Sequence, residues 1–344
     1  MLISMAKEIT LRNDYLNDKK VNSIYFGGGT PSCLTSEEIN SLLKKIYALY
    51  KINNNVEVTL ECNPDDLTYT KLLEFKNIGV NRLSIGVQSF SNTDLEFMNR
   101  SHNAEEAIKS IKMAQQTGFN NISVDLIYGL PKQTLKKWKK NIDQLFSLGV
   151  QHFSAYALTI EKKTTLHHLI KNKTITPLTD KKIINQFNLI QIEAQKRGFI
   201  HYEISNFGLE SFFSKHNTAY WKDNHYLGIG PSAHSYNGTE RSWNIASNTK
   251  YISSINSNQK FFEEEQLNVI QQYNEYVLTS LRTIWGINNV IIKNRYGEKA
   301  ELHFLKEIIK WKNKKYISSK SNVYTLTKEG KIFADTITSD LFII

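Results

Sequence analysis

The residues best suited to chemistry lie in a glycine loop near the start of the sequence, YFGGGTPS at residues 25–32. Its three glycines, among them Gly28 and Gly29, lack Cβ atoms, so their backbone carbonyls and amides can contact a ligand directly. Thr30 adds a hydroxyl. The pattern matches neither a dinucleotide-binding fingerprint nor a phosphate-binding P-loop. Three consecutive glycines exceed what a tight turn needs, so we interpret the loop as a contact for an ammonium group or a phosphate.

A second set of polar residues follows other candidate strands. Glu61, Gln88 and Asp125 stand at strand ends, and Arg100 follows a short helix in SNTDLEFMNR. Carboxylates can hold a ribose diol or an ammonium group, and an arginine can clamp a carboxylate with two hydrogen bonds. Each of these residues taken singly is equally well explained as part of a structural salt bridge. Together on one rim they suit a zwitterionic nucleoside ligand.

A third stretch, residues 203–244, is dense in aromatic residues, glycine, asparagine and histidine and contains no cysteine. Its histidines show no closely spaced pair of the kind that zinc sites use. His216 is followed by Asn217, Tyr220 and Trp221, an aromatic setting that can cover a flat ligand. Ordinary packing of these side chains is the alternative.

Short β-like runs, each followed by a helical pattern, must position these residues. The runs occupy residues 21–29, 55–62, 81–89, 121–129 and 151–159. Five such units in series predict a parallel α/β sheet or barrel. The runs are rich in Val, Ile, Leu and Phe, which is typical of parallel strands covered on both faces. In these folds ligands meet the carboxyl ends of the strands, where the candidate residues lie.

The βα rhythm stops near residue 165. A helix is expected over residues 180–198, weak periodicity follows over 201–246, and a long helical pattern resumes over 263–285. Two further helices and a short strand pair near 313–335 complete an order typical of a winged-helix module. We therefore predict three parts: a barrel-like domain at 1–170, a packed segment at 171–255 and a winged-helix-like domain at 256–344.

Composition narrows the class of protein. The chain has 344 residues, 40% of them hydrophobic and 22% charged, which are globular values. No apolar run approaches the roughly 18 residues that span a bilayer, and the first residues do not form a signal peptide, so we expect a cytoplasmic protein. Two cysteines exclude a disulfide framework and any four-cysteine metal site.

The net charge of +10 is compatible with an anionic partner such as nucleic acid, a membrane surface or a polycarboxylate ligand. The lysines are scattered over many helices, however, and do not gather in one arm. Compositional bias explains them, so we expect no nucleic-acid binding and keep peripheral membrane association as an alternative.

Five motifs in this order resemble a known family. YFGGGTPS, ECNPDD, RLSIGVQSF, MNRSH and VDLIYGLP resemble the radical S-adenosylmethionine (SAM) proteins of the oxygen-independent coproporphyrinogen III oxidase group. The later stretch EISNF…HNTAYW…YLGIGPSAHS…RSWN looks like the branch called HemW, the heme chaperone-like members. The resemblance covers almost the whole chain. It implies an incomplete (βα)6 radical SAM barrel with its first strand missing, an α/β fold, and a C-terminal helical, winged-helix-like domain.

The resemblance also assigns candidate roles to single residues. The implied SAM contacts are Gly28, Gly29, Thr30, Glu61, Gln88, Arg100, Asp125 and Ala157. Of these, Arg100 matches the arginine on the SAM carboxylate, Asp125 the carboxylate on its ribose, and Ala157 a contact near the adenine. The motif HNxxYW, which is associated with heme handling in this branch, matches His216, Asn217, Tyr220 and Trp221.

One departure from the family concerns the iron–sulfur cluster. The family's CxxxCxxC motif, which binds a 4Fe-4S cluster, does not occur in this sequence, and Cys33 and Cys62 are too few and on other loops. In the family three thiolates hold three irons and leave the fourth for SAM. Residues 1–16 resemble the helix that normally follows the cysteine loop. We therefore expect a truncated or a genuinely clusterless chain that does not perform radical chemistry.

Three functions remain as alternatives. The leading one is a heme chaperone that binds heme and delivers it to hemoproteins. The second is an oxygen-independent coproporphyrinogen III oxidase, which decarboxylates a porphyrin precursor. The third is nucleic-acid binding through the winged-helix-like tail, which we do not expect. The sequence leaves the heme acceptor, the axial heme ligand and the oligomeric state open.

Overall fold

The computed structural model describes all residues from 1 to 344 and arranges them as two compact units. One unit, here called the sheet unit, contains Ser23–Ser36 and Glu57–Phe213. The other, here called the split unit, contains Met1–Asn22, Glu37–Val56 and Ser214–Ile344. The chain therefore passes between the units several times. The division of the sequence at residues 170 and 255 stays a prediction.

A seven-stranded sheet forms the centre of the sheet unit, with the order β1-β2-β3-β4-β5-β7-β6. Strands β2 to β5 pair in parallel, whereas β7 is antiparallel to both β5 and β6. The predicted strands are confirmed, with adjusted ends. The bounds are β1 (Lys20–Phe26), β2 (Lys51–Cys62), β3 (Arg82–Gln88), β4 (Ile122–Tyr128), β5 (His152–Ala157), β6 (Ile200–His201) and β7 (Asn206–Gly208).

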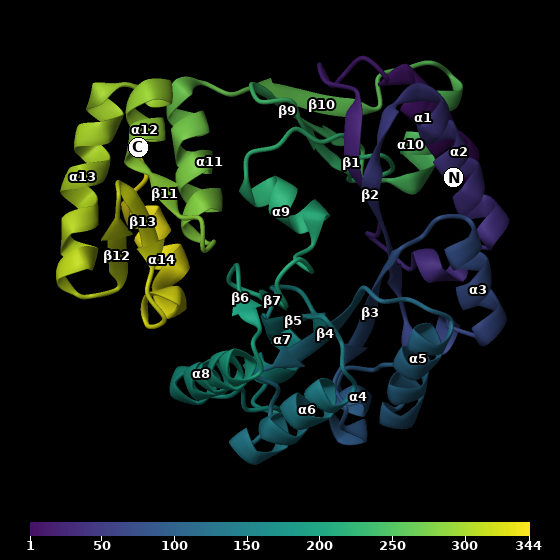
Figure 1. Cartoon of the computed structure of the whole chain (residues 1–344), viewed down its shortest axis with the longest axis horizontal. Helices are drawn as coiled ribbons and strands as arrows, with labels where there is room; N and C mark the ends of the chain where they lie inside the picture. Colours follow the sequence, from purple (N-terminus) through teal and green to yellow (C-terminus); the bar gives the residue numbers. More distant parts are fainter. The chain divides into compact units, whose positions relative to one another are not determined.

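Helices lie along the outer side of this curved sheet (Figure 1). Gly79 and Gly118, which follow two of them, have φ angles of +99° and +86°, the left-handed conformation that glycine adopts without strain after a helix. The helices are α3 (Tyr69–Asn77), α4 (Asn92–Phe97), α5 (Ala104–Gln116), α6 (Leu135–Ser147), α7 (Thr165–Lys171) and α8 (Asp180–Lys196).

The two faces of the sheet differ in polarity, although side chains on both faces are buried, as expected for parallel strands covered on both sides. Along β2, for example, the buried apolar Val58 and Leu60 alternate with Glu57, Thr59 and Glu61. Because successive side chains of a strand point to opposite faces, one face carries the apolar set and the other the polar set. The inner face of the curved sheet is polar because its side chains hydrogen-bond to one another.

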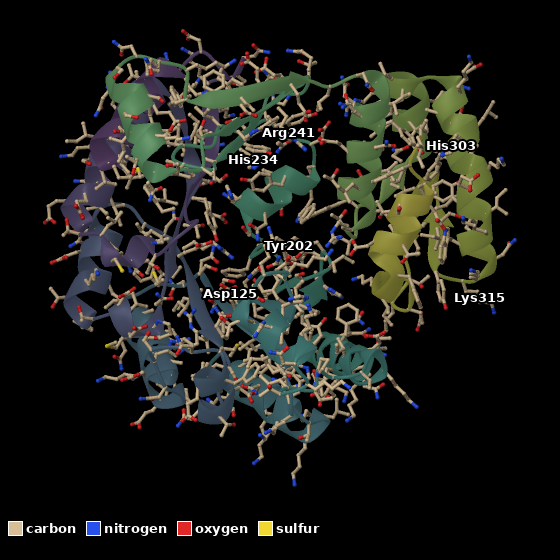
Figure 2. All side chains as sticks on the ribbon, turned by 180° about the vertical axis from the view of Figure 1, so that it is seen from behind. Asp125, Tyr202, His234, Arg241, His303 and Lys315 are labelled. Atoms are coloured by element: carbon tan, nitrogen blue, oxygen red, sulfur yellow. The ribbon has the colours of Figure 1, made fainter.

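A buried network near the amino ends of the strands shows this pairing. Nδ1 of His152 lies 3.3 Å from Nη2 of Arg82 and 2.7 Å from Oγ of Ser123, and Nε2 lies 2.8 Å from the hydroxyl of Tyr202. Arginine can only donate, so Nδ1 accepts and Nε2 carries the proton. Burial, followed by the nearby Arg82 charge, lowers the pKa of His152 well below its usual value. The imidazole is therefore neutral. Figure 2 labels Tyr202 and also Asp125, which lies further along the same inner face.

The split unit begins with helix α1 (Leu2–Leu11), whose partners come from far along the chain. They are the antiparallel sheet of β8 (His234–Tyr236), β9 (Glu240–Asn244) and β10 (Phe262–Gln266), together with helix α10 (Asn248–Asn256). Helix α2 (Ser36–Leu49) lies mostly in this unit. Tyr251, Ile255 and Phe261 form a core cluster here against which Met5 packs.

Glu8 is the central polar residue of this packing. It is fully buried, and its carboxylate accepts hydrogen bonds from the backbone amide of Gly230 at 2.8 Å, from Nδ2 of Asn244 at 2.6 Å and from the hydroxyl of Tyr251. Burial raises its pKa although these bonds oppose the rise. The donors thus satisfy a buried carboxylate and fix α1 against residues more than two hundred positions away.

The predicted helix over residues 263–285 is wrong at its amino end. Residues Phe262–Gln266 form the edge strand β10, which pairs with β9 from Phe262↔Asn244 to Gln266↔Glu240. The helix α11 (Val269–Leu281) starts only after Asn268, whose side chain caps it in a reciprocal pair with Gln271. The run of glutamates favours a helix locally, but cross-strand pairing with β9 determines its conformation.

Residues 269–340, here called the C-terminal module, consist of helices and a small sheet in the order expected of a winged-helix-like domain. Its small antiparallel sheet has the order β11-β13-β12, in which β11 lies between the first two helices in sequence and the pair β12–β13 follows the third (Figure 1). No helix of the chain is long and apolar enough to cross a membrane. Besides α11, the elements are β11 (Ile287–Asn288), α12 (Asn289–Tyr296), α13 (Glu298–Asn313), β12 (Ile317–Lys320), β13 (Val323–Leu326) and α14 (Ala334–Asp340).

Candidate functional site

The loops at the carboxyl ends of β1, β2 and β3 are tied together by a chain of hydrogen bonds. Ser32, in the turn after the glycines, donates to Asp66 at 2.6 Å and accepts from the backbone amide of Asn63 at 3.2 Å. Asn63 in turn accepts from Nη2 of Arg100 at 2.8 Å, and the same nitrogen lies 3.4 Å from the carbonyl of Gly86. Of the predicted site residues, Arg100 belongs to this connected rim, and Thr30 precedes the turn that carries Ser32.

Each glycine of the loop has its own structural reason. A Cβ on Gly27 would lie 2.6 Å from the ring of Tyr25 and 2.8 Å from Cδ of Glu61, so no side chain fits there. Gly28 has a φ of +80°, which disfavours other residues. A Cβ on Gly29 would meet nothing within 4 Å. The loop is exposed through Thr30, so its backbone is open to a ligand.

Glu61 lies beneath the glycine loop. The hydroxyl of Tyr25 donates to its Oε1 at 2.6 Å, which orients the carboxylate. Burial, followed by the charge of Glu61, raises the pKa of Tyr25, so the phenol keeps its proton. A carboxylate held in this way next to exposed backbone carbonyls can accept hydrogen bonds from an ammonium group.

Arg100 and Gln88 meet above Gly86 on β3. A Cβ on Gly86 would lie 3.0 Å from Nε2 of Gln88 and 3.7 Å from Nη2 of Arg100. Nε of Arg100 is buried and has no hydrogen-bond acceptor. Gln88 has a φ of +64°, a conformation that costs a non-glycine residue about 1 kcal/mol or more. Strain and an unpaired guanidinium nitrogen at one point are features of ligand sites.

Asp125 sits between Ser84 of β3 and Ser154 of β5 on the inner face. Oγ of Ser84 is 3.3 Å from its Oδ2. Burial raises the pKa of Asp125 from 3.8 to about 6, against the lowering effects of Ser154 and Arg82. The folded state consequently binds more protons than the unfolded chain between these two values, and stability falls as the pH rises through that interval.

Ala157 ends β5 opposite Tyr128 of β4 and is exposed. The preceding Tyr156 is also exposed, at 43%, which is unusual for a large aromatic side chain in a sheet. An exposed aromatic ring and a small residue at the same strand end suit a contact with a flat base.

The two cysteines do not fit a cluster site. Cys33 is exposed and Cys62 is buried, and both are free thiols. Burial, followed by the charge of Asp66, raises the pKa of each, so both remain thiols. No group of three or more His, Cys, Asp or Glu side chains among residues 1–344 is arranged to hold a metal ion. These residues therefore supply no ligand set for a 4Fe-4S cluster.

The HNxxYW residues lie in the split unit, on helix α9 (Lys215–Trp221). His216 and Tyr220 are four positions apart, and their rings meet edge to face at 4.9 Å. Tyr220 also contacts Tyr226 edge to face at 4.5 Å and is 37% exposed. The amide of Asn217 bonds to the capping hydroxyl of Ser214 at 3.1 Å. The motif thus forms an aromatic group around one histidine.

The phenol of Tyr220 is a poor candidate for an iron ligand. Burial raises its pKa to about 12, so it is neutral at pH 7. His216, half-buried beside it, is a better donor for heme iron. His225 and His234 are exposed in the same unit (His234 is labelled in Figure 2).

The chain matches the radical SAM superfamily model over residues 6–145. It is 32% identical over 319 residues to the heme chaperone HemW of Bacillus subtilis, covering 92% of this chain and 84% of that protein. The HemW of Lactococcus lactis is 31% identical, over 91% of this chain and 82% of that protein.

The chain belongs to the HemW family. The radical SAM fold is supported independently by the solved structure of Escherichia coli coproporphyrinogen III oxidase (HemN). Its TM-score is 0.83 at 20% identity, with 99% of this chain and 82% of that chain covered. The predicted fold class, a radical SAM partial barrel, is confirmed.

Sequence reasoning missed several residues of this HemW family site. Tyr25 orients Glu61, Asn63 links two loops, and Ser84 and Ser154 flank Asp125. Asn63 lies within the ECNPDD motif, and the serines alternate with buried apolar residues on their strands. That alternation was the available signal, and it points to the inner face of the sheet.

The open position of Gly29 generates a test that separates ligand binding from folding. Gly29→Val adds a side chain into open space, so the thermal midpoint should stay within about 2 °C of the wild type. Binding of SAM, measured by isothermal titration calorimetry, should weaken at least about tenfold because the side chain covers exposed backbone. Gly27→Val, whose side chain overlaps Tyr25 and Glu61, should lower both the thermal midpoint and the affinity for SAM. Unchanged SAM binding in Gly29→Val would remove the loop from the ligand site.

The raised pKa of Asp125 predicts a pH dependence of SAM binding. A ribose diol donates to the ionised carboxylate, which is the minor form below pH 6. At pH 5 about one tenth of the molecules carry it, so the affinity for SAM should be about tenfold lower than at pH 7.5. Asp125→Asn should bind more weakly and lose this pH dependence. A wild-type pH profile retained by Asp125→Asn would show that another group titrates.

Proposed function

We propose that this protein binds heme on helix α9 and delivers it to hemoproteins, and that it binds SAM at the rim of its sheet. The observation that carries the proposal is the α9 group, in which His216 stands beside the partly exposed Tyr220 in a member of the HemW family. Relatives in Bacillus subtilis and Lactococcus lactis are named heme chaperones.

The SAM site of the proposal uses the predicted residues in their predicted roles. The exposed backbone at Gly28, Gly29 and Thr30, with Glu61 below it, accepts the ammonium group. The unpaired Nε of Arg100 supports a bond to the SAM carboxylate, with Gln88 beside it. Asp125 receives the ribose hydroxyls, and Ala157 lies near the adenine. SAM is a methyl or radical donor when bound in enzymes, and here we assign it only a bound state.

The superfamily implies a 4Fe-4S cluster, but the residues of this chain do not fit one, as Cys33 and Cys62 show. We therefore derive no radical step. Enzymatic activity of this chain is not part of the proposal.

Heme binding is supported by the chemistry of α9. Protoporphyrin is flat and apolar with two carboxylates, and the ring of Tyr220 beside His216 suits its faces. Trp221, also a predicted heme contact, has its ring against Arg282 instead. Asn217 contributes an amide on the same helix. The partner of the heme-loaded form is a hemoprotein acceptor, as the chaperone role requires.

Other expectations stay predictions. They are a cytoplasmic location, the lack of nucleic-acid binding and peripheral association with anionic membranes through the net charge of +10. The last is the weakest because the charge is scattered over the sequence.

Heme titration of His216→Ala tests the axial ligand. The wild type should shift the Soret band of added hemin. His216→Ala should abolish the shift, because the neutral phenol of Tyr220, the other ring of this pair on α9, is a poor iron ligand. His225→Ala, an exposed histidine of the same unit, should behave as the wild type. If the wild type leaves the spectrum of free hemin unchanged, heme binding is refuted. If His216→Ala gives the same shifted spectrum as the wild type, His216 is not the axial ligand.

The alternative function is that of an oxygen-independent coproporphyrinogen III oxidase, which the fold shared with HemN favours. Incubation with coproporphyrinogen III, SAM and a reductant, followed by chromatography of the porphyrins, should yield no decarboxylated product. Any catalytic turnover above the protein-free control would contradict the chaperone proposal.

A further inference from the structure

The motif on α9 consists of two residue pairs on adjacent faces of the helix. His216 and Tyr220 are four positions apart, and so are Asn217 and Trp221, one position further on. Residues four apart share a face, and one position rotates the face by about 100°. The His216–Tyr220 pair forms the ring contact described above. Trp221 therefore points to a different side of the helix.

Trp221 faces the C-terminal module. The guanidinium carbon of Arg282, just after α11, lies 5.8 Å from the centre of the Trp221 ring, and Arg282 is itself held by an ion pair with Asp335. Nε1 of Trp221 is buried without an acceptor, so the contribution of this side chain comes from its ring. Helix α9 and helix α11 are in contact.

Two further contacts continue the same junction. The ammonium group of Lys222 lies 4.2 Å from the ring centre of Trp285. Asp223 accepts from Nη1 of Arg295 on α12 at 2.7 Å and from the hydroxyl of Tyr236 at 2.9 Å. Asp223 has a φ of +59°, which ends the helix at this point.

We propose that the C-terminal module positions the α9 helix for its ligand, with Arg282, Trp285 and Arg295 as the positioning residues. The module is thus a scaffold that sets the direction of the His216–Tyr220 face. Three weak contacts from consecutive residues fix both the rotation and the tilt of a helix that is only two turns long. The ligand named here, heme, rests on the proposed function, whereas the docking of α9 does not.

A double-mutant cycle on Asp223 and Arg295 tests the proposal. Asp223→Asn keeps the left-handed backbone and an acceptor for Tyr236 but removes the charge. Asp223→Asn and Arg295→Gln should each lower the affinity for hemin about fivefold and change the Soret or electron paramagnetic resonance spectrum of the bound heme. The double variant should lose about fivefold as well, since both changes remove one interaction. Arg295→Lys should restore most of the affinity.

The matched control is the ion pair of Lys310 and Asp340 in the same module, whose atoms are 2.8 Å apart. Asp340→Asn keeps an acceptor for Nε1 of Trp311 and should leave hemin affinity and spectrum unchanged. Wild-type affinity and spectrum in both Asp223→Asn and Arg295→Gln, or losses that multiply in the double variant, would overturn the proposal.

Hydrogen–deuterium exchange of peptides covering residues 214–223 provides a readout without heme. Exchange should be faster in Asp223→Asn and Arg295→Gln than in the wild type and in Asp340→Asn. Unchanged exchange in both variants would overturn the positioning role, whether or not the wild type binds hemin. Failure of the wild type to bind hemin, with faster exchange in both variants, would contradict the proposed function but not the positioning role.

Discussion

The polarity of the inner sheet face is the constraint on which the ligand rim depends. Glu61 lies near the carboxyl end of its strand and Asp125 in the middle of β4, whereas Arg82 and His152 lie at the amino ends of their strands. The neutral His152, bonded to Ser123 and Tyr202, satisfies the polar groups at the amino ends of the strands. Buried polar groups are tolerated only when paired, so this network permits the acidic groups above it to remain available for a ligand.

The available groups are poised by opposing local effects. Burial raises the pKa of Asp125, whereas the serines on neighbouring strands and the Arg82 charge lower it, and the result is about 6. Glu61 is oriented by one phenol, and Arg100 is fixed at one nitrogen while another has no acceptor. The rim is therefore rigid in its framework and incompletely satisfied at its surface, which is the condition for binding a small zwitterion.

Local sequence patterns predict much of the fold and of the candidate site. The strands and the strand-end positions of Glu61 and Gln88 follow from periodicity, and the motifs identified the family. Asp125, predicted at a strand end, lies instead in the middle of β4. The features that the sequence did not predict depend on contacts with residues far along the chain. Residues Phe262–Gln266 become a strand because β9 lies beside them, and the role of Trp221 depends on Arg282, sixty-one positions later. The polar face is visible in the sequence as the alternation of polar and apolar residues along β2. The overall apolar composition of the strands does not reveal it.

The buried Glu8 has a consequence for the order in which the protein is made. Its donors Gly230, Asn244 and Tyr251 are synthesised more than two hundred residues after Glu8. At about 5–20 residues per second, this delay is roughly 10–50 seconds. Until then the Glu8 carboxylate has none of these donors, and the sheet unit, which ends at Phe213, is synthesised before they are. The two units should then mature in sequence, and α1 must remain accessible until the second half of the chain arrives.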